Sequence, residues 1–166
     1  MRGRGANQRS IVFKLTPCDA STFETAPTIF RDPMEIARPG AEVWHELVAD
    51  GALGWCRALG GAQWTSPRPF GVGTTRTMRV AGALVINENF FRWEDGRRKS
   101  FYVVEANLPL FKYFSEDYLV EETSPTSCRF TWTMAGQSTP IAAPGAPLLA
   151  GLVRSMFADT RKHFGA

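Results

Sequence analysis

The sequence has 166 residues, of which 44% are apolar and 21% charged, and this composition suits one soluble domain with a substantial core. The formal net charge is +3, but four of the 19 basic residues lie in residues 1–14, which contain no acid, so the remaining chain is close to neutral. We therefore expect no nucleic-acid-binding face. Apolar runs are too short for a signal-peptide core or a membrane span, so we expect no stable membrane insertion.

The three cysteines, Cys18, Cys56 and Cys128, are odd in number and have no CxxC spacing. This pattern fits neither a disulfide scaffold nor a zinc site and is typical of a reducing compartment. We therefore expect a cytoplasmic protein with no metal and no cofactor. The sequence leaves the oligomeric state open, a homodimer included.

The first part of the chain, residues 1–22, is predicted to be a loosely ordered leader, and residues 23–166 to be one folded domain. A strand at 25–37 contains Pro33, which favours an edge position or a bulge. Two short helices follow, at 41–49 and 53–59, and glycines mark the break between them.

The middle of the chain has the alternation and turn signals of six further strands, at 60–64, 72–80, 84–93, 99–107, 113–122 and 128–136. Short connections such as Glu94-Asp95-Gly96 require antiparallel neighbours. A long helix at 146–163 begins with Pro147 in its first turn and has one apolar face. The expected fold is α+β: a seven-stranded antiparallel sheet curved around this helix, with two short helices between strands one and two.

Several short segments, in order along the chain, resemble signatures of the START-like superfamily, also called SRPBCC or helix-grip, in its polyketide cyclase/dehydrase-like branch. They are the segment IARPGAEVW at 36–44, Trp55, the segment GVGTTR at 71–76, Glu88 with Trp93, and the segment FADT at 157–160. The resemblance covers about residues 28–164. It implies a START-like ligand-binding domain with a cavity between the sheet and the last helix, and it does not identify the ligand.

Strand alternation then predicts which side chains face that cavity. If Glu105 points to water, Tyr102 and Val104 point inward. The resemblance implies that Glu88 points inward as well. A buried carboxylate needs a partner. The predicted ligand-binding residues are Trp64, Arg76, Met78, Ile86, Glu88, Phe90, Arg92, Tyr102, Val104, Tyr113, Ser115, Trp132, Met134, Met156 and Phe157.

These side chains favour binding of a small hydrophobic molecule, such as a lipid, a polyketide or an aromatic metabolite. One alternative is a metal-independent polyketide cyclase or dehydratase that uses Glu88 as its acid/base catalyst, with Tyr102 or Tyr113 orienting the substrate. A second alternative is a protein-interaction module that uses the outer face of the sheet. The apolar residues would serve equally well as ordinary core, and Glu88 as half of a structural ion pair.

Overall fold

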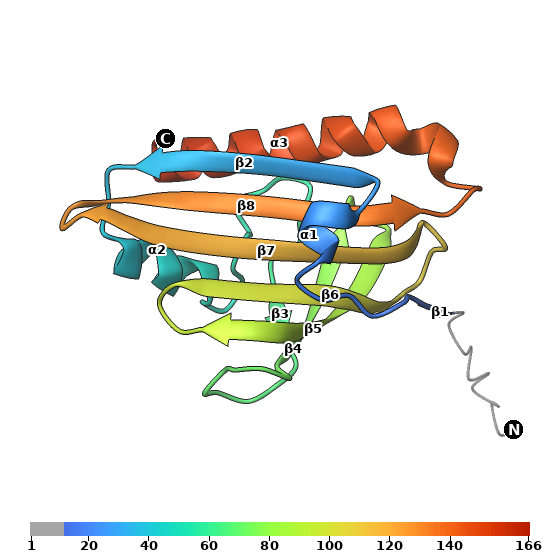
Figure 1. Cartoon of the computed structure of the whole chain (residues 1–166), viewed down its shortest axis with the longest axis horizontal. Helices are drawn as coiled ribbons and strands as arrows, with labels where there is room; N and C mark the ends of the chain where they lie inside the picture. Colours follow the sequence, from blue (N-terminus) through green and yellow to red (C-terminus); the bar gives the residue numbers. More distant parts are fainter. Residues whose placement is uncertain (1–11) are drawn as a thin grey trace, which may run out of the picture.

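The structure, a computed structural model, describes residues 12–166, in which an antiparallel sheet curves around helix α3 (Figure 1). The strands are β1 Phe13–Lys14, β2 Thr28–Ile36, β3 Gln63–Trp64, β4 Thr75–Val80, β5 Leu84–Glu94, β6 Arg98–Ala106, β7 Phe111–Ser124 and β8 Ser127–Ser138. The helices are α1 Thr22–Thr25, α2 Gly40–Leu47, the short 3-10 helix η1 Ala143–Gly145, and α3 Ala146–Phe164. Seven strands follow the order β2-β8-β7-β6-β5-β4-β3, which confirms the predicted α+β helix-grip architecture.

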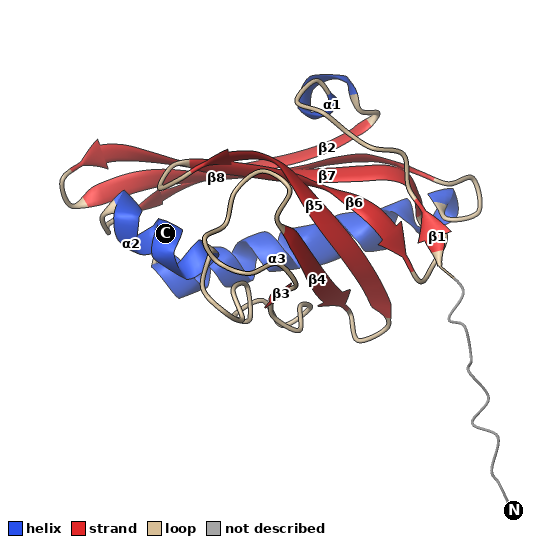
Figure 2. Ribbon diagram, turned by 90° about the horizontal axis from the view of Figure 1, so that it is seen from below, coloured by secondary structure: helices blue, strands red, loops and turns tan. Residues whose placement is uncertain are grey.

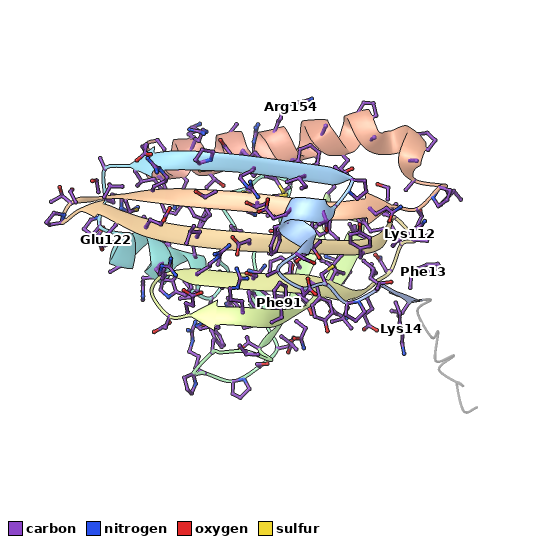
Figure 3. All side chains as sticks on the ribbon, in the orientation of Figure 1. Phe13, Lys14, Phe91, Lys112, Glu122 and Arg154 are labelled. Atoms are coloured by element: carbon purple, nitrogen blue, oxygen red, sulfur yellow. The ribbon has the colours of Figure 1, made fainter. Side chains whose placement is uncertain are left out.

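Helix α3 lies along the concave face of the sheet, and α1 lies on the opposite face (Figure 2). Val153, Met156 and Phe164 recur at helical spacing on the buried side of α3 and form part of the core. Gly165, in the left-handed conformation at φ 71°, ends the helix. Arg154 projects from α3 away from the sheet (Figure 3).

The edge strand β2 contains Pro33, as the sequence predicted, because an edge position does not need every backbone N–H. Arg161 of α3 donates a hydrogen bond of 2.8 Å to the carbonyl oxygen of Pro33, and its Nε donates to Asp32 at 3.0 Å. The end of α3 is thereby attached to the edge of the sheet.

The second short helix predicted at 53–59 is wrong. The segment forms successive turns, in which Gly54 N–H donates to Gly51 O and Cys56 N–H donates to Leu53 O. Gly51 and Leu53 have positive φ values of 70° and 66°, which an α-helix cannot contain.

The predicted leader also needs correction, since its described part, residues 12–22, belongs to the domain. Strand β1 pairs with β6, with Phe13 opposite Ala106, and Leu15 is buried. Phe23 of α1 stacks on Phe91 of the outer sheet face, with ring centroids 6.3 Å apart (Figure 3 labels Phe91). Residues 1–11 lie outside the described residues.

Three irregularities in the sheet decide which side chains reach the concave face, and one of them, in β5, lies between Phe90 and Arg92. Asn87 pairs with Glu105, whereas the next residue, Glu88, pairs with Val103, so Val104 is an extra residue in β6. Likewise Phe111 pairs with Ser138 and Tyr113 with Gln137, so there is an extra residue in β7. Each bulge reverses the alternation of inward and outward side chains beyond it.

Within residues 12–166, no helix combines the length and the apolar character that a membrane span requires.

Candidate functional site

A cavity of about 100 Å³, partly open to the surface, lies between the concave face of the sheet and α3. Its walls come from β4 to β8, from α3 and from the loops beside them, and they are mostly apolar. Three methionines, Met78, Met134 and Met156, are among the lining residues. Because methionine side chains are flexible, this wall can adapt its shape to a ligand.

The polar part of the lining begins with Arg76 and Glu88, which lie directly opposite each other on β4 and β5. Arg76 Nε donates to Glu88 Oε2, and the two side chains are only 1% and 2% exposed. Among the described residues, Nη1 of Arg76 has no hydrogen-bond partner. A buried donor without a partner is costly, so this atom is a candidate contact for a ligand.

Aromatic rings surround the Arg76 guanidinium. Its carbon Cζ lies 5.2 Å from the ring centroid of Trp64, 5.3 Å from that of Phe90 and 4.9 Å from that of Phe101. Cation–π attraction and the ion pair together offset the loss of hydration. Burial opposes the charge of Arg76, but the Coulomb attraction of Glu88 keeps its pKa above the usual value. Burial raises the pKa of Glu88, and Arg76 opposes that rise.

A second buried carboxyl, Glu116 of β7, also lines the cavity. Its Oε2 accepts hydrogen bonds from the Tyr118 hydroxyl at 2.6 Å and from Trp132 Nε1 at 2.9 Å. Burial, followed by the negative charge of Glu88, raises the pKa of Glu116 to about 7. This carboxyl therefore changes its charge near neutral pH.

The sequence reasoning missed Glu116 because it placed Ser115 inward, which turned Glu116 outward. The apolar residues Phe114, Tyr118 and Val120 of the same strand share the parity of Glu116. The alternation of these apolar residues along the strand was the sequence signal that could have identified Glu116 as inward-facing.

Lys99 of β6 is fully buried behind the cavity wall and does not line the cavity. Its Nζ donates to the carbonyl oxygen of Leu47, at the end of α2, and lies 4.9 Å from the ring centroid of Tyr118. Burial lowers the pKa of Lys99 well below its usual value. The carbonyl oxygen at the negative end of the helix partly compensates the buried ammonium.

The structure brings seven of the predicted site residues to the cavity wall: Arg76, Met78, Ile86, Glu88, Trp132, Met134 and Met156. Three others pack directly behind it. Trp64 and Phe90 contact the Arg76 guanidinium, and Phe157 packs edge-on against Trp132 with centroids 5.5 Å apart.

The inward placement of Tyr102, Val104, Tyr113, Ser115 and Arg92 is wrong, since none of them lines the cavity. The extra residue Val104 lets Glu105 pair with Asn87 on the outer face while Val103, rather than Val104, faces inward. The bulge near the start of β7 and the one between Phe90 and Arg92 have the same effect on their strands.

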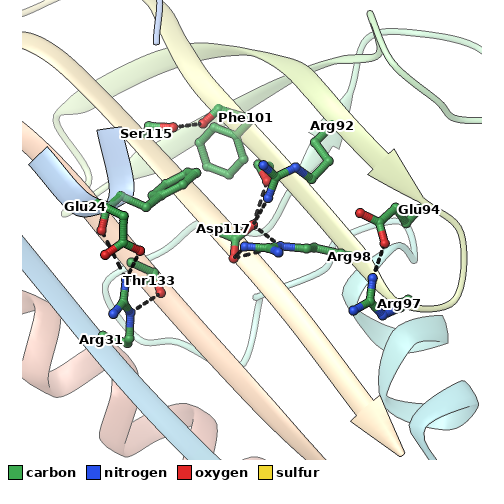
Figure 4. A network of polar contacts seen from close by, with 12 residues as sticks. Glu24, Arg31, Arg92, Glu94, Arg97, Arg98, Phe101, Ser115, Asp117 and Thr133 are labelled. Carbon is green, nitrogen blue, oxygen red and sulfur yellow. Dashed lines mark hydrogen bonds and ion pairs between the residues drawn. The ribbon is translucent and has the colours of Figure 1, made fainter. Parts of the chain in front are cut away.

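On the outer face, Arg92 and Arg98 pair with Asp117, with N–O distances of 3.7 and 3.0 Å (Figure 4). The Ser115 hydroxyl donates to the carbonyl oxygen of Phe101 at 2.6 Å.

A surface groove of about 320 Å³ adjoins the cavity. The two hollows share the lining residues Leu110, Phe111, Leu149 and Leu152. Leu148 and Ile141, at the start of α3 and in the loop before it, are about four-fifths exposed along this groove. The groove is thus an apolar approach to the cavity.

For metal binding, residues 12–166 contain no group of three or more His, Cys, Asp or Glu side chains placed to hold an ion.

Comparison with known proteins supports the fold and identifies a relative of the chain. No protein-family model matches it. The "Uncharacterized protein Rv2574" of Mycobacterium tuberculosis is 35% identical over 158 residues, which cover 90% of this chain and 94% of that protein.

Two solved structures share the fold at low sequence identity. A START superfamily protein from Mycobacterium smegmatis matches with a TM-score of 0.67 and 12% identity, over 82% of this chain and 97% of that one. The ZhuI aromatase/cyclase from a Streptomyces species matches with a TM-score of 0.58 and 12% identity, over 81% and 94% of the two chains.

Proposed function

Because this chain belongs to the START-like superfamily, in one family with the mycobacterial protein Rv2574, we propose that it binds a small, mostly apolar molecule between its sheet and α3. The observation that carries this proposal is the cavity itself. It is apolar over most of its wall and has a buried polar group, Arg76, with an unpartnered donor. Such a hollow is typical of ligand sites.

The volume of the cavity limits how a ligand can sit. A cavity of about 150 Å³ is known to hold benzene, and the cavity here has a volume of about 100 Å³. A larger lipid, polyketide or aromatic metabolite must move the methionine side chains or extend past Leu149 and Leu152 into the outer groove. The volume of the groove is about three times that of the cavity.

A cyclase or dehydratase that uses Glu88 is the alternative function. The buried Glu88 and its raised pKa favour proton transfer, and the ZhuI structure that shares the fold is an aromatase/cyclase. Glu88 is held in an ion pair with Arg76, however, and this contact favours an orienting role over a catalytic one. In a binding protein, Glu88→Gln keeps most of the ligand affinity, whereas in an enzyme it abolishes turnover.

The outer-face interaction module has less support. Arg92, Arg98 and Asp117 form ion pairs on that face, and α1 covers part of it. A charged, partly covered face is a poor apolar docking surface.

The proposal can be tested with ethylbenzene, a small probe without polar groups, by calorimetry or ligand-observed NMR. Leu152→Trp adds bulk where cavity and groove meet, and we expect it to weaken binding at least tenfold. Arg154→Trp is the matched control, because Arg154 projects from the same helix away from the sheet, and we expect little change in binding. Absence of binding to the wild type, or equal binding by Leu152→Trp, would contradict the proposed site.

A further inference from the structure

Two polar atoms of residues that line the cavity have no hydrogen-bond partner among the described residues. Arg76 Nη1 is one, as described above. The other is Oε1 of Glu116, because both hydrogen bonds recorded among the described residues for this carboxyl end on Oε2. Both residues line the cavity, and both are buried.

The strand register brings these two groups to one region of the concave face. Arg76 is opposite Glu88, Glu88 is opposite Val103, and two residues earlier in β6 Phe101 is opposite Glu116. These register partners form a row that crosses β4, β5, β6 and β7 nearly at right angles to the strands. The Arg76 and Glu116 side chains both line the cavity, and the charge of each affects the pKa of the other, so one ligand atom between them can contact both.

On this basis, and resting on the proposed function, we propose that the cavity binds a neutral ligand whose carbonyl oxygen accepts hydrogen bonds from Arg76 Nη1 and from protonated Glu116. The ligand class is a ketone, aldehyde or ester with an otherwise apolar body. The uncharged carboxyl holds its proton on Oε1, because Oε2 already accepts from Tyr118 and Trp132.

The charges around the site favour a neutral ligand over a carboxylate. Glu88 already neutralises Arg76, so a ligand anion would find no uncompensated positive charge there. It would also lie near the carboxyl groups of both Glu88 and Glu116. A carbonyl oxygen needs donors only and introduces no charge into the low-dielectric interior.

The protonation of Glu116 depends on groups from each element packed around it. The titratable and charged groups are Arg76 on β4, Glu88 on β5, Lys99 on β6, Tyr118 on β7 and Cys56 in the segment after α2. Helix α3 contributes apolar side chains such as Val153 and Met156 to the wall facing it. Burial against the apolar wall and the charge of Glu88 favour the neutral carboxyl, whereas the hydrogen bonds from Tyr118 and Trp132, followed by Arg76, favour the ionised form.

Binding of a carbonyl ligand should therefore weaken as Glu116 ionises. With its pKa at about 7, Glu116 is mostly protonated at pH 6 and mostly ionised at pH 8, and its protonated fraction falls about tenfold between them. An alcohol behaves differently, because the ionised carboxylate accepts a hydrogen bond from its hydroxyl group.

Three probes of matched shape separate these possibilities: acetophenone, 1-phenylethanol and ethylbenzene, each titrated by calorimetry at pH 6 and pH 8. We expect acetophenone to lose about tenfold in affinity at pH 8, while 1-phenylethanol and ethylbenzene change less than twofold. Glu116→Gln mimics the neutral carboxyl, with its amide oxygen accepting from Tyr118 and Trp132 and its NH₂ facing the cavity. This variant should bind acetophenone equally at both pH values.

Ethylbenzene separates failure of this inference from failure of the proposed function. If ethylbenzene binds, but acetophenone binds no more tightly than ethylbenzene at pH 6 and its affinity does not depend on pH, the carbonyl assignment is overturned and the apolar site remains. If none of the three probes binds, both are overturned. The comparison of wild-type affinities at pH 6 and pH 8 does not need the variant, so it remains a valid test if Glu116→Gln folds poorly.

Discussion

Arg76 and Glu88 place two full charges in the least exposed part of the molecule. Each would be prohibitively expensive alone, because an unpaired ion loses its hydration without compensation. Together, and with the aromatic rings around the guanidinium, they become tolerable. The pair is therefore expected to contribute little net stability relative to apolar residues of similar size, although either half alone is strongly destabilising.

This difference can be measured with methionine, whose size is close to that of both residues. Arg76→Met leaves Glu88 without its partner and should lower the free energy of unfolding by about 3 to 5 kcal/mol. Adding Glu88→Met should recover most of that loss. Urea unfolding followed by circular dichroism gives both values. A single variant that costs less than about 1 kcal/mol would contradict a buried ion pair.

Glu116 predicts a pH dependence of stability. The pKa of Glu116 is about 7 in the folded protein and near the ordinary glutamate value of 4.5 in the unfolded chain. Over this interval the folded state keeps a proton that the unfolded state has lost, so the free energy of unfolding decreases as pH rises from 4.5 to 7 and then levels off. Below pH 4.5 the contribution is fully present.

The variant Glu116→Gln isolates this contribution, because the other titrating groups are common to both proteins. Its free energy of unfolding relative to wild type should increase by roughly 2 to 3 kcal/mol from pH 5 to pH 8. Urea unfolding at the two pH values measures it. A constant difference between the proteins would mean that Glu116 is already ionised at pH 5.

At the scale of elements, the sequence predicted every long strand and the last helix, because alternation, turn residues and helical periodicity are local signals. It could not predict the bulges. Glu105 was correctly placed toward solvent, yet Val104 is an extra residue, so Val103 rather than Val104 faces inward. A bulge depends on the register of the neighbouring strand, and a single strand's pattern does not contain it. Residues on strands where the parity held, such as Met78 and Trp132, were placed correctly at the cavity wall.

The pairing of β7 with β8 depends on a close approach at Gly136. A Cβ atom there would lie 2.7 Å from the carbonyl oxygen of Tyr113, a backbone atom that cannot move freely. Gly136→Ala should therefore lower the free energy of unfolding by about 2 kcal/mol.

Gly151 is the matched control for this substitution. It lies within α3, away from the helix ends, on the exposed side of the helix. An added Cβ atom there would have no neighbouring atom close to it. Gly151→Ala should raise the free energy of unfolding by about 1 kcal/mol, because alanine favours the helix. Thermal or urea unfolding of the two variants measures both changes in the free energy of unfolding. Destabilisation by Gly151→Ala would mean that α3 packs differently.

At the scale of the whole molecule, α3 runs along one face of the sheet (Figure 2), and the cavity lies between the two. At the end of α3, Phe130 packs edge-on against Phe164, with ring centroids 6.5 Å apart, and fills the space between sheet and helix. Toward the start of α3, the lining leucines and methionines leave the cavity and the groove beside it. The proposed function requires that this space takes up a ligand.

The most direct test is NMR of the protein labelled with ¹³C at its methionine methyl groups, titrated with ethylbenzene. Met78, Met134 and Met156 line the cavity, whereas Met34 is equally buried but lies in β2 away from it. We predict that the signals of the three lining methionines shift in a saturable way while that of Met34 does not. An absence of shifts, or a shift of Met34 with the lining methionines unchanged, would contradict an internal ligand site between the sheet and α3.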